Sequence, residues 1–369
     1  MRSIGFNDAQ IAIAAIIISA VMLVLQVPSG ILADRWSRKG MLIVASIALG
    51  VNSAACGLSH SVVSYMFAVS LWGVFYALYG GSYDSIVYDT LIEETGDSKG
   101  FEKCYGKVKL YDAVALAAGS LLSGVVGKFI GLRATYFLTI PFTMISIIAL
   151  IKFREPQLHR AGTKSALGRH TIDTIKAVLG RGRIFWIVLT LVFMILGERI
   201  VFEFCQLWYL AFIVPVLLFG PFNALVQSSV GTSGYLAHKI KNSHGLIFFL
   251  SVFLVVCSLA LTSKYSVGLV VAAQTILITG FTAFNILLSH EMHDLLPSKI
   301  RAGSSSTVGM LSQMVFLPVA YLFGRLSKQF TIFKASWVIV AVTLLAVAGL
   351  YVVLVQGRTA ARDKNIQTS

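Results

Sequence analysis

Eleven long apolar segments recur along this chain of 369 residues, and they constrain its fold more than any other feature. A helix needs about 20 mostly apolar residues to cross the hydrocarbon of a bilayer. Hydrophobic residues make up 57% of the sequence and charged residues only 12%, which excludes a soluble enzyme, a disordered chain and a disulfide scaffold. We therefore predict an all-α membrane protein with spans at 10–32, 41–59, 63–88, 110–127, 134–151, 184–208, 214–236, 245–262, 267–290, 303–324 and 335–355.

Basic residues are distributed unequally between the loops that join these spans. Alternate loops hold 22 of the 30 lysines and arginines, and membrane proteins concentrate such residues on the cytoplasmic side. The N-terminus is then expected outside and the C-terminus in the cytoplasm. The same bias explains the net charge of +14, so no nucleic-acid partner is expected. The basic loops are 33–40, 89–109, 152–183, 237–244, 291–302 and 356–369.

The longest of the basic loops divides the chain into two parts. We predict an N-terminal bundle of five spans over 1–151, a cytoplasmic linker over 152–183, a six-helix bundle over 184–355 and a cytoplasmic tail over 356–369. Part of the linker can form a short surface helix against lipid headgroups. A solvated linker that simply obeys the charge rule is the alternative.

Two short segments, one in each half, resemble each other. The first is Gly-Ile-Leu-Ala-Asp-Arg-Trp-Ser-Arg-Lys-Gly at 30–40, and the second is Gly-Tyr-Leu-Ala-His-Lys-Ile-Lys at 234–241. Both leave a predicted span on the cytoplasmic side. The first segment is similar to the loop signature of the major facilitator superfamily, G-x-L-A-D-R-x-G-R-[RK], with Ser37 in place of the second glycine. The second segment is a decayed copy, in which His238 replaces the acid.

This resemblance implies a secondary transporter of twelve helices in two bundles, which rock about a site at mid-membrane. Eleven spans are present, and alignment of the halves places the deficit at the first family helix. Either the start is truncated or misplaced, in which case upstream codons encode another apolar run, or the protein is an eleven-span variant. The signature residues Gly30, Asp34, Arg35, Arg38 and Lys39 are then expected to form a cytoplasmic gate.

Two contacts would build such a gate. Asp34 can approach a helix N-terminus, where backbone N–H groups favour an anion. Arg38 can reach an acid at the end of span 63–88, either Asp89 or Asp84. The alternative is a positive-inside loop with incidental ion pairs.

Ionisable groups inside a membrane are costly and commonly functional. Three carboxylates, Asp84, Asp112 and Glu198, are candidates for proton coupling. Asp84 and Asp112 can be neighbours, and each can instead pair with nearby bases. Arg199 and Glu203 have i, i+4 spacing and can satisfy each other. Glu198 has no such partner on its helix, and it lies either at an exchange site or near the outer water boundary.

Other polar and aromatic side chains in the spans are candidates to line a substrate cavity. Three tyrosines recur at helical spacing, and the alternative for them is ordinary helix packing. An aromatic, sparsely polar cavity would suit an amphipathic or weakly basic compound. The cavity candidates are Tyr76, Tyr79, Tyr83, Gln206, Asn223, Gln227 and Asn285.

Enzyme chemistry is not expected, because the sequence has no phosphate-binding glycine-lysine loop and no metal-ligand spacing, and no cofactor is predicted. We predict proton-coupled efflux of a small organic solute by a monomer in a bacterial plasma (inner) membrane. Its partners would be that solute, protons and the lipid bilayer. The antiporter-type Gly-Pro signature is missing from span 110–127. Nutrient uptake and a non-transporting or truncated membrane paralogue are the alternatives.

Overall fold

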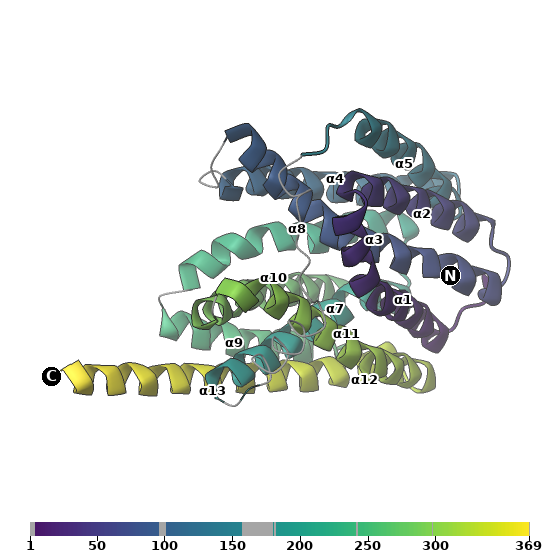
Figure 1. The fold of residues 1–369 in the computed structure, drawn as a ribbon. Coiled ribbons are helices and arrows are strands. Elements are labelled where there is room, and N and C mark those ends of the chain that lie inside the picture. The colour runs from purple at the N-terminus through teal and green to yellow at the C-terminus, as the bar shows by residue number, and fades with distance from the viewer. Residues whose placement is uncertain are drawn as a thin grey trace. The chain divides into compact units, whose positions relative to one another are not determined.

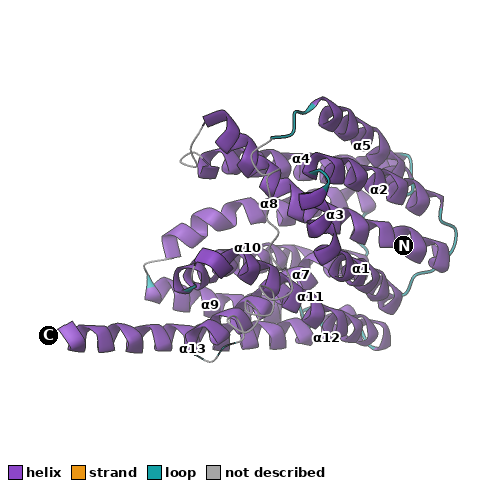
Figure 2. Cartoon of the chain, viewed as in Figure 1, coloured by secondary structure: helices purple, strands orange, loops and turns teal. Residues whose placement is uncertain are grey.

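A computed structural model describes residues 4–95, 101–156, 180, 182–240, 243–296 and 298–368. Within these ranges the chain is helical and contains no strand (Figures 1 and 2). Each of the eleven predicted spans is helical over most of its length. The helices are α1 (Asp8–Arg35), α2 (Arg38–Leu58), α3 (Val62–Thr95), α4 (Phe101–Phe129), α5 (Ala134–Lys152), α7 (Arg183–Ala211), α8 (Val216–Ile240), α9 (His244–Ala260), α10 (Val267–Leu295), α11 (Ser298–Gln329), α12 (Ile332–Ala335) and α13 (Trp337–Thr368).

Nine helical segments in the described part of the chain are long and apolar enough to cross a membrane, and 245–260 forms a shorter apolar helix. The span predicted at 214–236 is helical but falls outside these nine. Its sequence carries Asn223 and Gln227 among several serines and glycines, which lower its hydropathy. Several helices are longer than predicted, because α3, α10 and α13 continue beyond their apolar stretches.

Polar caps and a strained turn define several helix boundaries. Asn7 and Gln10 form a reciprocal capping box at the start of α1, in which each side chain accepts a hydrogen bond from the other's backbone N–H at 3.0 Å. The predicted division within 184–236 occurs after Ala211. Ile213 adopts a φ of 54° there, which is unusual for a β-branched residue, and α8 begins directly after Pro215.

The chain separates into two compact units. Unit 1 comprises Met1–Thr163, Val214–Ala224 and Ala320–Lys328, and unit 2 comprises Lys164–Ile213, Leu225–Val319 and Gln329–Ser369. The first unit thus contains α1 to α5 together with the beginning of α8 and the end of α11. Most of the linker predicted over 152–183 lies outside the described residues.

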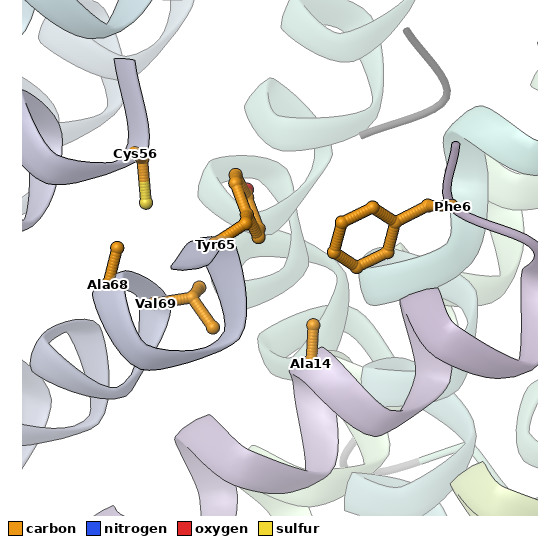
Figure 3. Close-up of a cluster of buried hydrophobic side chains, with 6 residues drawn as sticks. All are labelled: Phe6, Ala14, Cys56, Tyr65, Ala68 and Val69. Atoms are coloured by element: carbon orange, nitrogen blue, oxygen red, sulfur yellow. The ribbon is translucent and has the colours of Figure 1, made fainter. Parts of the chain in front are cut away.

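In unit 1, α3 packs against α1 and α2, and α2 also packs against α5. An aromatic core joins these helices, where the ring of Phe6 meets Tyr65 edge-on at 5.2 Å between centroids. The hydroxyl of Tyr65 is 2.8 Å from that of Tyr136 on α5. Figure 3 shows the core residues Phe6, Ala14, Cys56, Tyr65, Ala68 and Val69.

In unit 2, α7 packs against α10 and α13, and α9 packs against the same two helices. Trp208 and Tyr209 are fully buried on α7. The indole of Trp208 donates to the Leu261 carbonyl at 3.0 Å, and the Tyr209 hydroxyl donates to Gln274 Oε1 at 3.1 Å. Both polar ends are therefore satisfied away from water, as a bilayer requires.

Candidate functional site: charged and aromatic groups of the two units

The signature segment 30–40 forms the junction between α1 and α2. Ser37 is the N-cap of α2 and accepts a hydrogen bond from Gly40 N at 2.8 Å, while its own hydroxyl donates to Glu155 at 2.7 Å. Glu155 also accepts from the backbone N–H of Lys39 at 3.2 Å. The residue that departs from the family signature, Ser37, is thus a helix cap that is tied to the chain after α5.

Two basic residues of the signature bind groups on other helices. Arg38 forms an ion pair and hydrogen bond with Asp89 on α3. Lys39 Nζ donates to the carbonyls of Ile151 and Phe153, both at 2.8 Å, and so neutralises the exposed C-terminus of α5. These contacts join the cytoplasmic ends predicted for α2, α3 and α5.

Several predicted residues are placed only in part. The backbone of Gly30, Asp34, Arg35 and Asp84 is helical, but the side chains of Asp34, Arg35 and Asp84 lie outside the described part of the structure. The predicted approach of Asp34 to a helix start, and the predicted proximity of Asp84 to Asp112, therefore remain predictions.

The tyrosine stripe of α3 forms a stack of rings. Tyr79 and Tyr83 are stacked with centroids 4.7 Å apart, and Phe75 stacks on Tyr79 at 5.3 Å. The stripe ends at a carboxylate, because the Tyr83 hydroxyl lies 3.2 and 3.4 Å from the two oxygens of Asp112 on α4. Tyr76 is 43% exposed. The structure thus brings a predicted cavity residue and a predicted proton site into direct contact.

A second group of polar side chains lies halfway along α7 in unit 2. The Glu198 carboxyl interacts with the side chain of Thr282 on α10, whose hydroxyl donates to the Ile278 carbonyl at 2.8 Å. Arg199 is hydrogen bonded to Gln313 on α11, and its guanidinium lies 4.2 Å from the ring centroid of Phe316. Sequence reasoning missed Thr282, Gln313 and Phe316 as partners of this group. An isolated glutamine in the apolar stretch 303–324 was the available signal.

The remaining cavity candidates are distributed between the units. Gln206 on α7 is exposed, while Asn285 on α10 is partly buried and accepts a hydrogen bond from Ser289 at 3.1 Å. Asn223 and Gln227 are partly buried on α8, the former in unit 1 and the latter in unit 2.

Unit 1 also contains close contacts of α8 and α11 with the N-terminal helices. Ser327 donates to Asp8 Oδ2 at 2.6 Å, and Gly324 lies against Ala12. A Cβ on Gly124 would approach Gly220 to 3.1 Å, so α4 and α8 nearly touch through their backbones. At the described side chains, we find no group of three or more histidine, cysteine or acidic residues that could hold a metal ion.

The long apolar helices in the described part of the chain define a multi-pass membrane protein. The sequence profile of the Major Facilitator Superfamily matches residues 1–306, and the chain belongs to this family. A search of curated proteins gives no match.

Solved transporter structures share the fold. A bacterial homologue of the human lysosomal transporter Spinster, in an inward-facing and unoccupied conformation, superposes with a TM-score of 0.75 at 14% identity and covers 98% of this chain and 91% of its own. The nucleoside transporter NupG superposes with a TM-score of 0.70 at 14% identity, and the match covers 96% of this chain and 91% of the NupG chain. The xylose transporter XylE from E. coli superposes with a TM-score of 0.67 at 14% identity, and the match covers 93% of this chain and 86% of the XylE chain.

Proposed function

We propose that this protein exports a small organic compound in exchange for protons, by alternating access between two helical bundles. The observation that carries this proposal is the contact between Tyr83 and Asp112, which places a carboxylate at the end of a stack of aromatic rings within the spans. Aromatic faces and a carboxylate together attract an amphipathic, weakly basic molecule. The same carboxylate can accept a proton when that molecule leaves.

Proton coupling is assigned to three carboxylates: Asp112, Glu198 and, as a prediction from sequence, Asp84. Asp112 accepts a hydrogen bond from the Tyr83 hydroxyl, and the Glu198 carboxyl interacts with Thr282, whose hydroxyl donates to the Ile278 carbonyl at 2.8 Å. A hydroxyl donates to a carboxylate and accepts from a carboxylic acid, so it can remain bonded in both protonation states. Such pairs suit a group that gains and loses a proton during a cycle.

The gate is assigned to contacts at opposite ends of unit 1. The ion pair of Arg38 and Asp89 lies at the end that the charge bias predicts to be cytoplasmic, and the bond of Ser327 to Asp8 lies at the other. Alternate breaking of such contacts would expose a central site to one side at a time. Asp34 and Arg35 are included in this gate by resemblance alone.

The protein would act as a monomer in a bacterial plasma membrane, with its C-terminus in the cytoplasm. The loop charge bias supports this orientation. The two-unit organisation over 1–151 and 184–355, joined by a basic linker, is likewise proposed from sequence and family.

Reconstitution in liposomes tests the proposal. A panel of weakly basic aromatic compounds is applied under an imposed pH gradient, and internal pH and compound uptake are recorded together. We expect compound movement to drive opposite proton movement, and we expect Asp112→Asn and Glu198→Gln to abolish this coupling. Glu94→Gln, a change at an exposed cytoplasmic end, is the control and should leave coupling intact. Proton-independent transport in the unaltered protein would defeat the proposal.

Uptake of a nutrient is the second candidate. The structural similarity to a nucleoside transporter and to a xylose transporter favours it, because those proteins are named for such solutes. The two candidates differ in the direction of the coupled flux. Accumulation of nucleosides or pentoses with protons moving the same way would favour uptake, and an absence of any solute flux would favour a non-transporting paralogue.

A further inference from the structure

The partly exposed face of α7 carries three polar side chains beside the exposed Phe202 and Leu210, while the opposite face is buried. Arg199, Glu203 and Gln206 are spaced i, i+4 and i+7, which places them within about 60° of one another around a helix. Gln206 is exposed, and the Glu203 side chain is 32% exposed. On the opposite face, Phe204 and Trp208 are buried within unit 2. Charged residues rarely face lipid, so this polar face marks a route that water can reach.

The arginine on this face is held by groups besides the glutamate. Arg199 is hydrogen bonded to Gln313, and its guanidinium covers the ring of Phe316. Its Nε lies 3.8 Å from Glu203 Oε1, beyond the length of about 2.7–2.9 Å typical of a charge-assisted hydrogen bond. Arg199 thus forms the i, i+4 ion pair with Glu203 that the spacing predicts, and it also has contacts with Gln313 and Phe316 outside that pair.

This arrangement allows Glu203 to exist in two protonation states. When Glu203 is ionised, the adjacent guanidinium offsets its charge in a medium of low dielectric constant. When it is protonated, Arg199 keeps its amide and aromatic contacts, so no cation is left without contacts in the membrane. A glutamate bound tightly to its arginine would instead stay ionised and would not become protonated.

Other titratable groups lie on α7 and on the helices of unit 2. On α7 itself, Glu198 interacts with Thr282 on α10, and Cys205 and Tyr209 are buried. The charged groups of α10 are confined to its last turns, from His290 to Asp294, and those described on α11 near its end are Arg325 and Lys328. On α12 and the described side chains of α13, Lys334 and Tyr351 are the ionisable ones. The described structure places Arg199 beside Glu203, with its Nε 3.8 Å from the carboxylate oxygen Oε1.

We propose that Glu203 is a proton-exchanging carboxylate of the transport cycle and that Arg199, oriented by Gln313 and Phe316, is its positioning residue. The proton arrives from water along the Gln206 side of α7, binds a carboxylate oxygen of Glu203 and returns to water when the opposite side opens. This inference rests on the proposed proton-coupled function, to which it adds a residue that sequence analysis explained by pairing alone.

Infrared difference spectroscopy on the full chain in lipid nanodiscs tests the proposal without a substrate. We expect the unaltered protein to show a carboxylic-acid band that responds to pH, and we expect this band to be lost in Glu203→Gln. Glu94→Gln should retain it. Persistence of every titrating band in Glu203→Gln would overturn the assignment. If that variant does not fold, Glu203→Asp must shift the band, and an unchanged band would overturn the assignment equally.

The role of Arg199 is tested by the pH at which the Glu203 band titrates. Loss of the positive charge in Arg199→Gln should move the titration of the Glu203 band to higher pH by about one unit or more, because a nearby cation favours the ionised acid. Arg199→Lys should restore most of that shift. An unmoved band in Arg199→Gln would show that the arginine is only structural.

Liposome measurements separate this inference from the proposed function. If the unaltered protein couples solute flux to protons and Glu203→Gln does so equally, the inference falls and the proposed function stands. If Glu203 titrates but solute flux never moves protons, the proposed function falls instead.

Discussion

Arg38, in the first turn of α2, forms an ion pair with Asp89 near the end of α3. Asp89 is only 6% exposed, so its charge depends on this guanidinium for compensation. Sequence reasoning named two possible acids for Arg38, and the structure identifies Asp89 as a partner. The contact joins two helices of unit 1 at the end where the signature segment lies.

Removal of the arginine should destabilise unit 1. We expect Arg38→Ala to lower the free energy of unfolding by about 3 kcal/mol, because a buried carboxylate would lose its counter-charge. Arg38→Lys should lose less, and Asp89→Asn combined with Arg38→Ala should recover part of the loss. Thermal unfolding in detergent measures these changes. Equal stability of Arg38→Ala and the unaltered protein would show that the pair is incidental.

The serine that interrupts the family signature should matter as a cap. Ser37→Ala removes the acceptor for Gly40 N and the donor to Glu155, and we expect a loss of about 1 kcal/mol in stability. Ser37→Gly, which restores the signature, should cost less, because glycine is tolerated at an N-cap. Chemical unfolding of the two variants side by side provides the comparison. A larger loss for glycine than for alanine would contradict the capping explanation.

The close approach of α4 and α8 should not tolerate an added methyl group. A Cβ at Gly220 would lie 2.5 Å from the Ser120 carbonyl oxygen, so Gly220→Ala must push the helices apart at a cost of about 1–3 kcal/mol. Gly231 is on the same helix and has no neighbour within 4 Å of such a Cβ. Gly231→Ala should therefore be neutral or stabilising, since alanine favours helix. Melting temperatures of the two proteins test the contrast.

The hydroxyl of Tyr83 should contribute to substrate binding through Asp112. Tyr83→Phe removes a hydrogen bond to the carboxylate, and we expect affinity for a weakly basic substrate to fall about five-fold, equivalent to about 1 kcal/mol. Tyr111→Phe is the control, because Tyr111 is exposed on α4. Equilibrium binding in detergent gives both values. Identical affinities would remove the Tyr83 and Asp112 pair from the substrate site.

The contact of Ser327 with Asp8 should bias the proposed gate. Ser327→Ala removes a hydrogen bond of 2.6 Å, so the end of α11 should separate from α1 more often. A cysteine introduced at Ala12, which Gly324 covers, reports this separation through its reaction with a thiol reagent. We expect the reaction to be about five-fold faster in Ser327→Ala, because loss of the hydrogen bond shifts the equilibrium between the closed and separated states by about 1 kcal/mol. Ser228→Ala, at an exposed serine of α8, should leave the rate unchanged. An unaltered rate in Ser327→Ala would remove this bond from the gate.

Most of the fold could be predicted because hydrophobicity is read locally along the chain. The segment 10–32 contains no charged residue, and α1 covers it completely. Prediction was less accurate where polar residues continue a helix, as at the end of α3, because backbone hydrogen bonds extend a helix into water without any apolar signal. The division after Ala211 was recognisable from Pro215, which is favoured at or just before a helix start.

The candidate site was predicted only as a list of residue types. Sequence alone identified Tyr83, Asp112, Glu198 and Arg199 as unusual in apolar surroundings, because the cost of polar groups in hydrocarbon depends on composition. It assigned Arg199 to Glu203 by spacing, and it did not identify Gln313 or Phe316. Those partners lie more than a hundred residues away.

The sequence by itself determined which stretches become membrane helices and where charges interrupt them, because both follow from the chemistry of neighbouring residues. Only the tertiary structure decided that Tyr83 meets Asp112 and that Arg199 rests on Phe316. Such contacts depend on how far each helix is rotated and shifted against the next. Packing across whole helices sets those quantities, and no local pattern encodes them.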